Sequence, residues 1–184
     1  MGVLLRESLR DAPVVRFGEY QYFVHPLSDG VPAIDPRLLT EVAQEIARVA
    51  DLDVDKIVTA EAMGIPLATA LSLAAGIPFV IIRKRRYGLP GEVVVDQRTG
   101  YSKGALHING LSPGDRVLIV DDVISTGGTL NPVLDALKGM GVVVKDVVII
   151  FEKGDGKAAV EKRHGIRVKT LQRIDVRDGR VIPV

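Results

Sequence analysis

The pattern of apolar residues predicts strands that alternate with helices along most of the chain. Residues 117–120 are apolar, mostly β-branched and without polar alternation, which is typical of a strand buried on both faces. Further strands are predicted at 56–60, 79–82 and 146–151, the last of them also buried in the parallel sheet. Helices are predicted at 36–49, 66–75 and 130–138, the first with Asp35 as N-cap. Because such alternation builds parallel sheets, we predict an α/β fold with a central, mostly parallel sheet flanked by helices.

The two ends of the chain predict smaller elements. Residues 3–9 have the spacing of a short amphipathic helix, and the aromatic-rich residues 17–24 predict a strand or hairpin, followed by a turn-rich loop at 25–30. The chain closes with a strand at 168–172 and a hairpin around Asp178-Gly179. No composition break marks a linker, so we predict a single domain spanning residues 1–184.

The stretch from Val117 to Thr129 carries the clearest chemical signal. Asp121 and Asp122 follow the apolar run where the strand is expected to end, and open α/β sheets bind ligands at the carboxyl ends of their strands. Hydroxyls and glycine amides then follow in Ser125-Thr126-Gly127-Gly128-Thr129, directly before a helix start that favours an anion. A phosphorylated ribose fits both parts, since carboxylates accept hydrogen bonds from vicinal hydroxyls and help to hold Mg²⁺.

Two further segments predict a second anion site and a lid. Ala62, Met63 and Gly64 stand between a strand end and a helix start, where backbone amides can bind an anion. The basic run 83–86 opens a Gly-rich segment of about twenty residues, with Lys103 near its end, and long segments in compact domains usually act as lids. Alone, four basic residues would indicate only a solvated surface.

Composition narrows the classes of function. The 24 Lys and Arg residues against 23 Asp and Glu residues give a net charge of +1, which argues against bulk affinity for nucleic acid or membranes. The absence of cysteine excludes disulfides and Cys-ligated zinc. The N-terminus meets charged residues too soon for a signal peptide, and Pro and Gly interrupt the apolar stretch 65–82. We therefore expect a soluble cytoplasmic protein.

Residues 117–129 resemble the phosphoribosyl pyrophosphate (PRPP) signature of type I phosphoribosyltransferases. Segments 22–36, 60–66 and 82–104 are similar to the archaeal hypoxanthine/guanine phosphoribosyltransferases, which are relatives of adenine phosphoribosyltransferase. The resemblance covers nearly the whole chain. It implies the type I phosphoribosyltransferase fold, with a small hood from about 13–34 and the C-terminal segment, a flexible lid at about 83–105, and a homodimer.

The resemblance also implies a role for each candidate residue. The ribose and 5′-phosphate of PRPP would contact Asp121, Asp122, Ser125, Thr126, Gly127, Gly128 and Thr129, with Mg²⁺ reaching Asp121 and Asp122 through PRPP or water. The pyrophosphate would contact Ala62, Met63, Gly64, Arg83 and Lys84. The lid would supply Arg86, Tyr87, Tyr101 and Lys103, and the base would contact Phe23, His25, Val123 and Glu152. Lys153 is an alternative to Glu152 for reading the base edge, although a solvated turn explains both residues.

The implied reaction is transfer of phosphoribose from PRPP to hypoxanthine or guanine, with release of pyrophosphate. Ser125 and Gly128 stand where human-type enzymes carry Asp and Lys, which favours adenine as the alternative substrate and leaves the general base unassigned. Gly100 aligns with a Glu of the adenine enzymes, and Met63 with an Arg. A PRPP-sensing regulator is a further alternative. It would need a DNA-binding segment, and only about sixteen residues precede the first expected strand.

Overall fold

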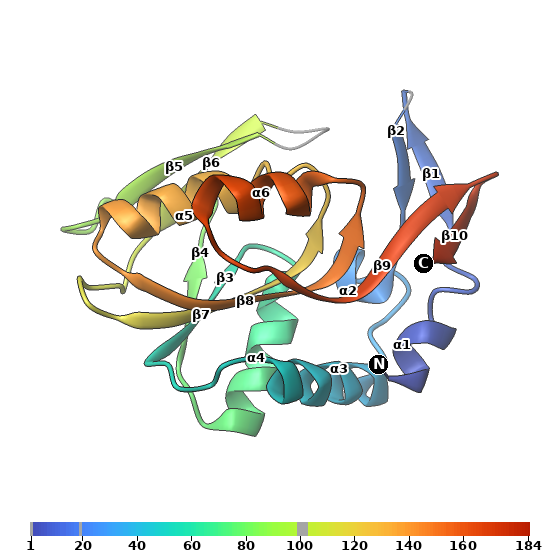
Figure 1. Ribbon diagram of the computed structural model, residues 1–184, viewed down its shortest axis with the longest axis horizontal. Helices are drawn as coiled ribbons and strands as arrows, with labels where there is room; N and C mark the ends of the chain where they lie inside the picture. Colours follow the sequence, from blue (N-terminus) through green and yellow to red (C-terminus); the bar gives the residue numbers. More distant parts are fainter. Residues whose placement is uncertain (1, 19, 99–102) are drawn as a thin grey trace.

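A six-stranded sheet forms the centre of the computed structural model, which describes residues 2–18, 20–98 and 103–184 (Figure 1). The strand order is β10-β9-β8-β7-β3-β4, and every pairing is parallel except that of β10 with β9. The strands are β3 (Lys56–Ala60), β4 (Phe79–Ile82), β7 (Arg116–Ile124), β8 (Val143–Lys153), β9 (Lys169–Arg177) and β10 (Arg180–Pro183). The predicted α/β fold is confirmed.

Helices cover both faces of this sheet. Helices α3 (Pro36–Val49) and α4 (Gly64–Ala75) lie on one face, and α5 (Leu130–Gly139) and α6 (Gly156–His164) lie on the other (Figure 1). Asp35 caps α3 as predicted, since its Oδ1 accepts a hydrogen bond from the Arg37 amide at 2.8 Å. The turn at Asp178-Gly179 joins β9 to β10, so that predicted hairpin is also confirmed.

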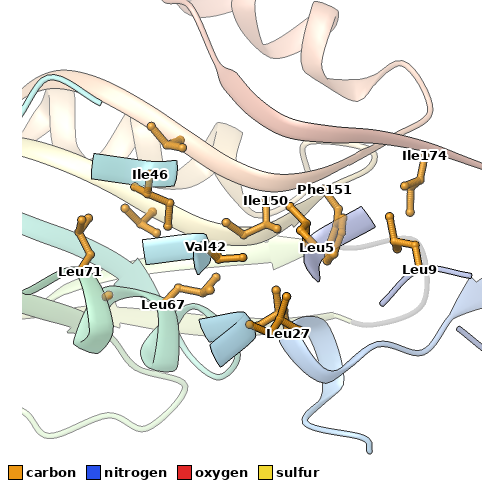
Figure 2. Packing of buried hydrophobic residues seen from close by; sticks show 14 of the residues in the cluster. Leu5, Leu9, Leu27, Val42, Ile46, Leu67, Leu71, Ile150, Phe151 and Ile174 are labelled. Carbon is orange, nitrogen blue, oxygen red and sulfur yellow. The ribbon is translucent and has the colours of Figure 1, made fainter. Parts of the chain in front are cut away.

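Alternation along the central strands divides the core into two layers. In β8, Val148 and Ile150 belong to the layer under α3 and α4, whereas Val147 and Ile149 belong to the layer under α5. Figure 2 shows the first layer, where side chains from α3 and α4 meet Ile150 and Phe151 of β8. Burial on both faces explains why these strands read as continuous apolar runs.

The N-terminal segment packs beside the carboxyl ends of the sheet. It contains α1 (Val3–Glu7), a hairpin of β1 (Val14–Phe17) and β2 (Tyr20–Phe23), and the single turn α2 (Pro26–Asp29). The hairpin confirms the expected element, while α2 replaces the expected loop at 25–30. Glu41 of α3 holds α1 in place, because its two carboxylate oxygens accept hydrogen bonds from the amides of Leu4 and Leu5 at 3.1 and 2.9 Å.

The segment expected to be a flexible loop contains an antiparallel pair, β5 (Val93–Arg98) and β6 (Lys103–Ile108). Val95, Leu106 and Ile108 are buried in the same layer as α5, so one face of this arm belongs to the core. Glu92 fixes the base of the arm by accepting hydrogen bonds from the Tyr87 and Gly88 amides and from Asn109. The segment predicted as a lid therefore contains a two-stranded arm in its described residues.

Two other element predictions need correction. Strand β7 does not end before the acidic pair but continues to Ile124, because β8 is long enough to pair with it up to Glu152. Helix α6 follows Gly154-Asp155-Gly156, which sequence patterns indicate only as a flexible turn. Val160 is its single buried residue, so its sequence lacks the apolar stripe that predicts a helix.

Candidate active site

A cavity of about 420 Å³ opens beside the carboxyl ends of β3 and β7. Every part of the chain that the sequence singled out contributes to its wall, together with the N-terminal segment and the end of β8. The described lining residues are Tyr22, Phe23, Ser28, Asp29, Ala60, Glu61, Ala62, Met63, Lys84, Gln97, Asp121, Asp122, Val123, Ile124, Ser125, Thr126, Gly127, Gly128, Thr129, Leu130, Ile149 and Lys153. This position is the one that open parallel sheets use for ligands.

The loop 125–129 forms one end of the cavity, between β7 and α5. Helix α6 supports this loop from behind, since the Gly156 amide donates a hydrogen bond to the Ser125 carbonyl at 2.9 Å. A Cβ atom at residue 156 would lie 2.1 Å from that carbonyl oxygen, so only glycine permits this approach. The loop therefore keeps its hydroxyls and amides at the cavity wall, in front of the α5 N-terminus, which suits a phosphate group.

Asp121 and Asp122 lie next to this loop and are half-buried. Burial raises the pKa of Asp121 to about 6. The pKa of Asp122 is also raised, first by burial and then by the charge of Asp121. A Cβ atom at Gly64 would lie 2.9 Å from Asp121 Oδ1, so the start of α4 packs directly against this carboxylate. Two poorly solvated carboxylates of this kind gain from ligands that bring hydroxyls or a cation.

The second expected anion site is present in part. Ala62, Met63 and Lys84 line the cavity, while Gly64 is buried behind it. Arg83 is not among the described lining residues, because its guanidinium Nε donates a hydrogen bond to Glu61 Oε2 at 2.8 Å. The Lys84 amide donates to the same oxygen at 3.0 Å and, with Arg83, holds the pKa of Glu61 below its usual value. Arg83 and Lys84 were both expected to contact the second anion. This geometry supports that contact for Lys84 better than for Arg83.

Two of the four candidate base contacts line the cavity, namely Phe23 and Val123. His25 does not, because it is fully buried, with Nδ1 accepting from the Leu27 amide and Nε2 lying 2.8 Å from Ser8 Oγ. Burial lowers the pKa of His25 to about 4, so the ring is neutral at pH 7. His25 is a structural residue of the N-terminal segment, so this geometry does not support the predicted base contact.

Glu152 also points away from the cavity. Its Oε2 accepts hydrogen bonds from Lys157 Nζ at 3.0 Å and from Thr170 Oγ1 at 2.8 Å. Successive side chains of a strand alternate between the two faces, so Lys153 lines the cavity instead, with Nζ donating to the Gln21 carbonyl. This geometry therefore does not support the predicted base contact of Glu152, whereas its alternative Lys153 lines the cavity.

The segment predicted as a lid contributes to the cavity wall, but the lid residues predicted from the sequence are not among the described lining residues. Gln97 of β5 lines the cavity, and its Nε2 donates a hydrogen bond to Thr129 Oγ1 at 2.7 Å, so the arm touches the phosphate-type loop. Arg86 and Tyr87 are exposed and are not among the described lining residues. Tyr101 lies outside the described residues, as does the side chain of Lys103.

Among the polar lining residues that the sequence did not identify as site residues, Tyr22, Asp29 and Gln97 were not singled out, and Lys153 was weighed only as an alternative. A cue existed for Lys153, because it directly follows the apolar run of β8 at the carboxyl end of the sheet. The other three are ordinary polar residues of surface-type segments, and only the packing of the hairpin, α2 and the arm against the sheet brings them together.

The acidic pair has the donor set of a magnesium site that depends on its substrate. Among the described residues there is no group of three or more His, Cys, Asp or Glu side chains that could hold a metal ion. Mg²⁺ commonly binds through one or two carboxylates plus substrate phosphates, and Asp121 and Asp122 fit that arrangement. Separately, the described part of the chain contains no helix with the length and apolar character needed to cross a membrane.

A parallel sheet with a phosphate-type loop and an acidic pair at its carboxyl edge defines an α/β domain that binds a phosphorylated sugar or nucleotide. Residues 34–177 match the family described as the phosphoribosyl transferase domain. The chain belongs to the phosphoribosyl transferase family, and its fold is the type I phosphoribosyltransferase fold.

Relatives and solved structures agree with this assignment. The chain is 59% identical over 179 residues to the hypoxanthine/guanine phosphoribosyltransferase of Methanocaldococcus infernus, covering 97% of this chain and 98% of that protein. It is 58% identical over 177 residues to the protein of the same name from Methanothermobacter thermautotrophicus, covering 96% and 92%. The adenine phosphoribosyltransferase structure from Thermoanaerobacter pseudethanolicus has a TM-score of 0.75 at 22% identity, covering 92% of this chain and 98% of that one.

Replacing Asp121 with Asn tests the free-energy cost of burying this charge. The pKa of about 6 in the fold lies above the ordinary 3.8, so the ionised group destabilises the protein above pH 6, and the cost disappears as the pH falls to the ordinary value. We expect Asp121→Asn to raise the free energy of unfolding by about 1–2 kcal/mol at pH 7 and to leave it nearly unchanged at about pH 4. Chemical denaturation at both pH values measures the difference.

If Asp121 accepts hydrogen bonds from the ribose hydroxyls of PRPP, as the resemblance implies, the same variant should bind PRPP more weakly. Asp11→Asn is the control, since Asp11 is exposed and is not among the described lining residues. A variant that is less stable than wild type at pH 7, or one that binds PRPP with unchanged affinity in titration calorimetry, would contradict the role of Asp121.

Proposed function

We propose that this protein is a purine-salvage enzyme that transfers phosphoribose from PRPP to hypoxanthine and guanine and releases pyrophosphate. The observation that carries the proposal is the identity of 55–59% with archaeal hypoxanthine/guanine phosphoribosyltransferases, which extends over nearly the full length of both chains. The cavity offers an independent physical rationale, because it has separate places for a phosphate, a ribose, a second anion and a flat base.

PRPP would lie along the wall formed by the strand ends. Its 5′-phosphate would occupy the loop 125–129, its ribose hydroxyls would face Asp121 and Asp122, and its pyrophosphate would reach the backbone of 62–63 and Lys84. Mg²⁺ bound with the pyrophosphate would supply charge neutralisation to the leaving group. The protein's own part is to hold the anomeric carbon in line with the base and to place a cation near the departing charge.

The base would lie against Phe23 and Val123, with Lys153 at its edge. Hypoxanthine and guanine carry a carbonyl oxygen at position 6, which accepts hydrogen bonds, whereas adenine carries an amino group there. A lysine ammonium has three donors and no acceptor, so it binds the carbonyl and leaves the amine unsatisfied. Lys153 therefore favours the 6-oxopurines, although Ser125 and Gly128 match the adenine enzymes.

Substrate preference tests the proposal directly. Purified protein with PRPP and Mg²⁺ should form nucleotide from hypoxanthine and guanine, with much lower kcat/KM for adenine, xanthine and orotate. Chelation of Mg²⁺ should abolish turnover, and added Mg²⁺ should restore it. Preference for adenine would mean that the motif residues Ser125 and Gly128, rather than Lys153, decide specificity. Turnover that survives chelation would overturn the role of the metal.

Replacing Lys153 with Met tests the proposed reading of the base edge. The variant keeps an unbranched side chain but loses the donor, so kcat/KM for hypoxanthine and guanine should fall by about 10–100-fold while the low rate with adenine stays unchanged. Lys157→Met is the control, because Lys157 pairs with Glu152 and is not among the described lining residues. An equal loss for all three purines would show that Lys153 does not select the base.

We also propose that the enzyme is a homodimer that uses the outer face of α4 and the neighbouring edge strand β4. The sequence of α4 has no charged residue, and Leu73 on its outer face is 83% exposed although Leu67 and Leu71 are buried beneath. Strand β4 ends the sheet and leaves Phe79 half-buried. Helices that are apolar all round and edge strands with apolar side chains are normally covered, and a two-fold axis would let a second copy cover both.

Introducing a charge at Leu73 tests this surface. We expect wild-type protein to elute in size-exclusion chromatography with light scattering at twice the monomer mass, and Leu73→Asp to elute as a monomer or a weakened dimer. Leu89→Asp, at an exposed leucine in the arm region, should remain dimeric. A monomeric wild type, or a Leu73→Asp variant with unchanged mass, would contradict the proposed interface.

A further inference from the structure

The proposed reaction requires a proton acceptor, because a neutral purine must lose an N–H proton when it forms the bond to ribose. We infer that Asp29 is that acceptor. The inference rests on the proposed function, and it concerns a residue of the N-terminal segment that the PRPP signature does not include.

Elimination among the cavity carboxylates leads to Asp29. The described lining residues contain four acidic side chains: Asp29, Glu61, Asp121 and Asp122. Glu61 is committed to the Arg83 guanidinium and the Lys84 amide on the pyrophosphate side. Asp121 and Asp122 stand beside the phosphate-type loop, where they face the ribose. Asp29 alone lies on the side of the cavity that carries Tyr22 and Phe23, and therefore on the side proposed for the base.

The surroundings of Asp29 fix the direction of its carboxylate. Oδ1 accepts a hydrogen bond from Tyr22 Oη at 2.6 Å, and Oδ2 accepts from the His25 amide at 2.9 Å and from Ser28 Oγ at 2.7 Å. A carboxylate has about four acceptor positions. Among the described contacts three positions are used, which leaves one on Oδ1 of this cavity-lining residue.

No cation in the described residues is paired with Asp29, in contrast to most carboxylates of the chain. Its three donors are a backbone amide and two hydroxyls, which orient the carboxylate without neutralising its charge. The nearby His25 ring is neutral at pH 7 because burial lowers its pKa. Asp29 therefore faces the base as an oriented carboxylate with a free acceptor position, which is what a general base requires.

The proton transfer balances with the group transfer. The N9 lone pair of the purine forms the bond to the anomeric carbon, and the bond from that carbon to pyrophosphate breaks, its electron pair leaving with the pyrophosphate oxygen. The N7–H electron pair returns to the ring as the proton moves to Asp29 Oδ1. Product release then allows Asp29 to pass the proton to water. Tyr22 acts as a positioning residue in this step, since it holds the same carboxylate oxygen.

Asp29→Asn keeps the shape of the side chain and removes the base, which makes it the main test. With hypoxanthine at saturating PRPP and Mg²⁺, kcat should fall by about 100-fold or more, while PRPP affinity in calorimetry stays near wild type. The deficit should be much smaller with 8-azahypoxanthine, because the extra ring nitrogen makes its N–H more acidic and reduces the need for a base. A merely structural role of Asp29 would lower both rates equally.

Matched variants keep the test decisive if the Asn variant folds poorly. Asp29→Glu retains a carboxylate and should recover part of the rate that Asp29→Asn loses. Tyr22→Phe retains the aromatic ring and leaves Asp29 in place. It should lower kcat with hypoxanthine by about 10-fold, and the loss of kcat should again be smaller with 8-azahypoxanthine. Asp11→Asn serves again as the control and should behave as wild type.

The outcomes separate this inference from the proposed function. Wild-type turnover with hypoxanthine, together with an Asp29→Asn variant within about 3-fold of wild type, would overturn the role of Asp29 alone. Equal deficits of Asp29→Asn and Tyr22→Phe on hypoxanthine and 8-azahypoxanthine would do the same. Absence of wild-type turnover with either 6-oxopurine would overturn the proposed function, and the inference with it.

Discussion

The burial of two adjacent carboxylates at the end of β7 is the constraint on which the rest of the site depends. Desolvation raises the pKa values of Asp121 and Asp122, and the charge of Asp121 adds to the effect on Asp122, so the fold bears a free-energy cost for keeping both ionised. That cost is characteristic of functional sites, where stability is given up for chemistry. The extended pairing of β7 with β8 and the close packing of Gly64 keep the pair in place.

The other parts of the site are arranged around this edge of the sheet. Helix α6 supports the phosphate-type loop through Gly156, the arm reaches it through Gln97, and the N-terminal hairpin closes the opposite side with Tyr22 and Phe23. Each contributor comes from a different region of the sequence, but all are anchored in one of the two core layers. A rigid sheet thus supports a cavity wall that is built from separate segments of the chain.

Sequence patterns predicted the scaffold well and the wall of the cavity only in part. Strands β3 and β4 begin and end where their apolar runs do, because burial on both faces leaves a clear signal. The loop 125–129 and the acidic pair were found because they are contiguous. His25 and Glu152 do not line the cavity, because their orientation depends on packing that the sequence does not reveal. His25 caps α2 and contacts Ser8, and Glu152 lies on the opposite face of β8 from Lys153. Helix α6 and the strands of the arm carried no strong periodicity, and tertiary contacts decide both.

The most direct test of this account is a crystal structure of the protein with IMP, the product of the proposed reaction with hypoxanthine. We predict that its phosphate lies within hydrogen-bonding distance of residues 125–129, that its ribose hydroxyls contact Asp121 and Asp122, and that its O6 contacts Lys153 Nζ. A phosphate bound at residues 62–64, or a base that lies away from Lys153 and Tyr22, would contradict the assignment of the cavity.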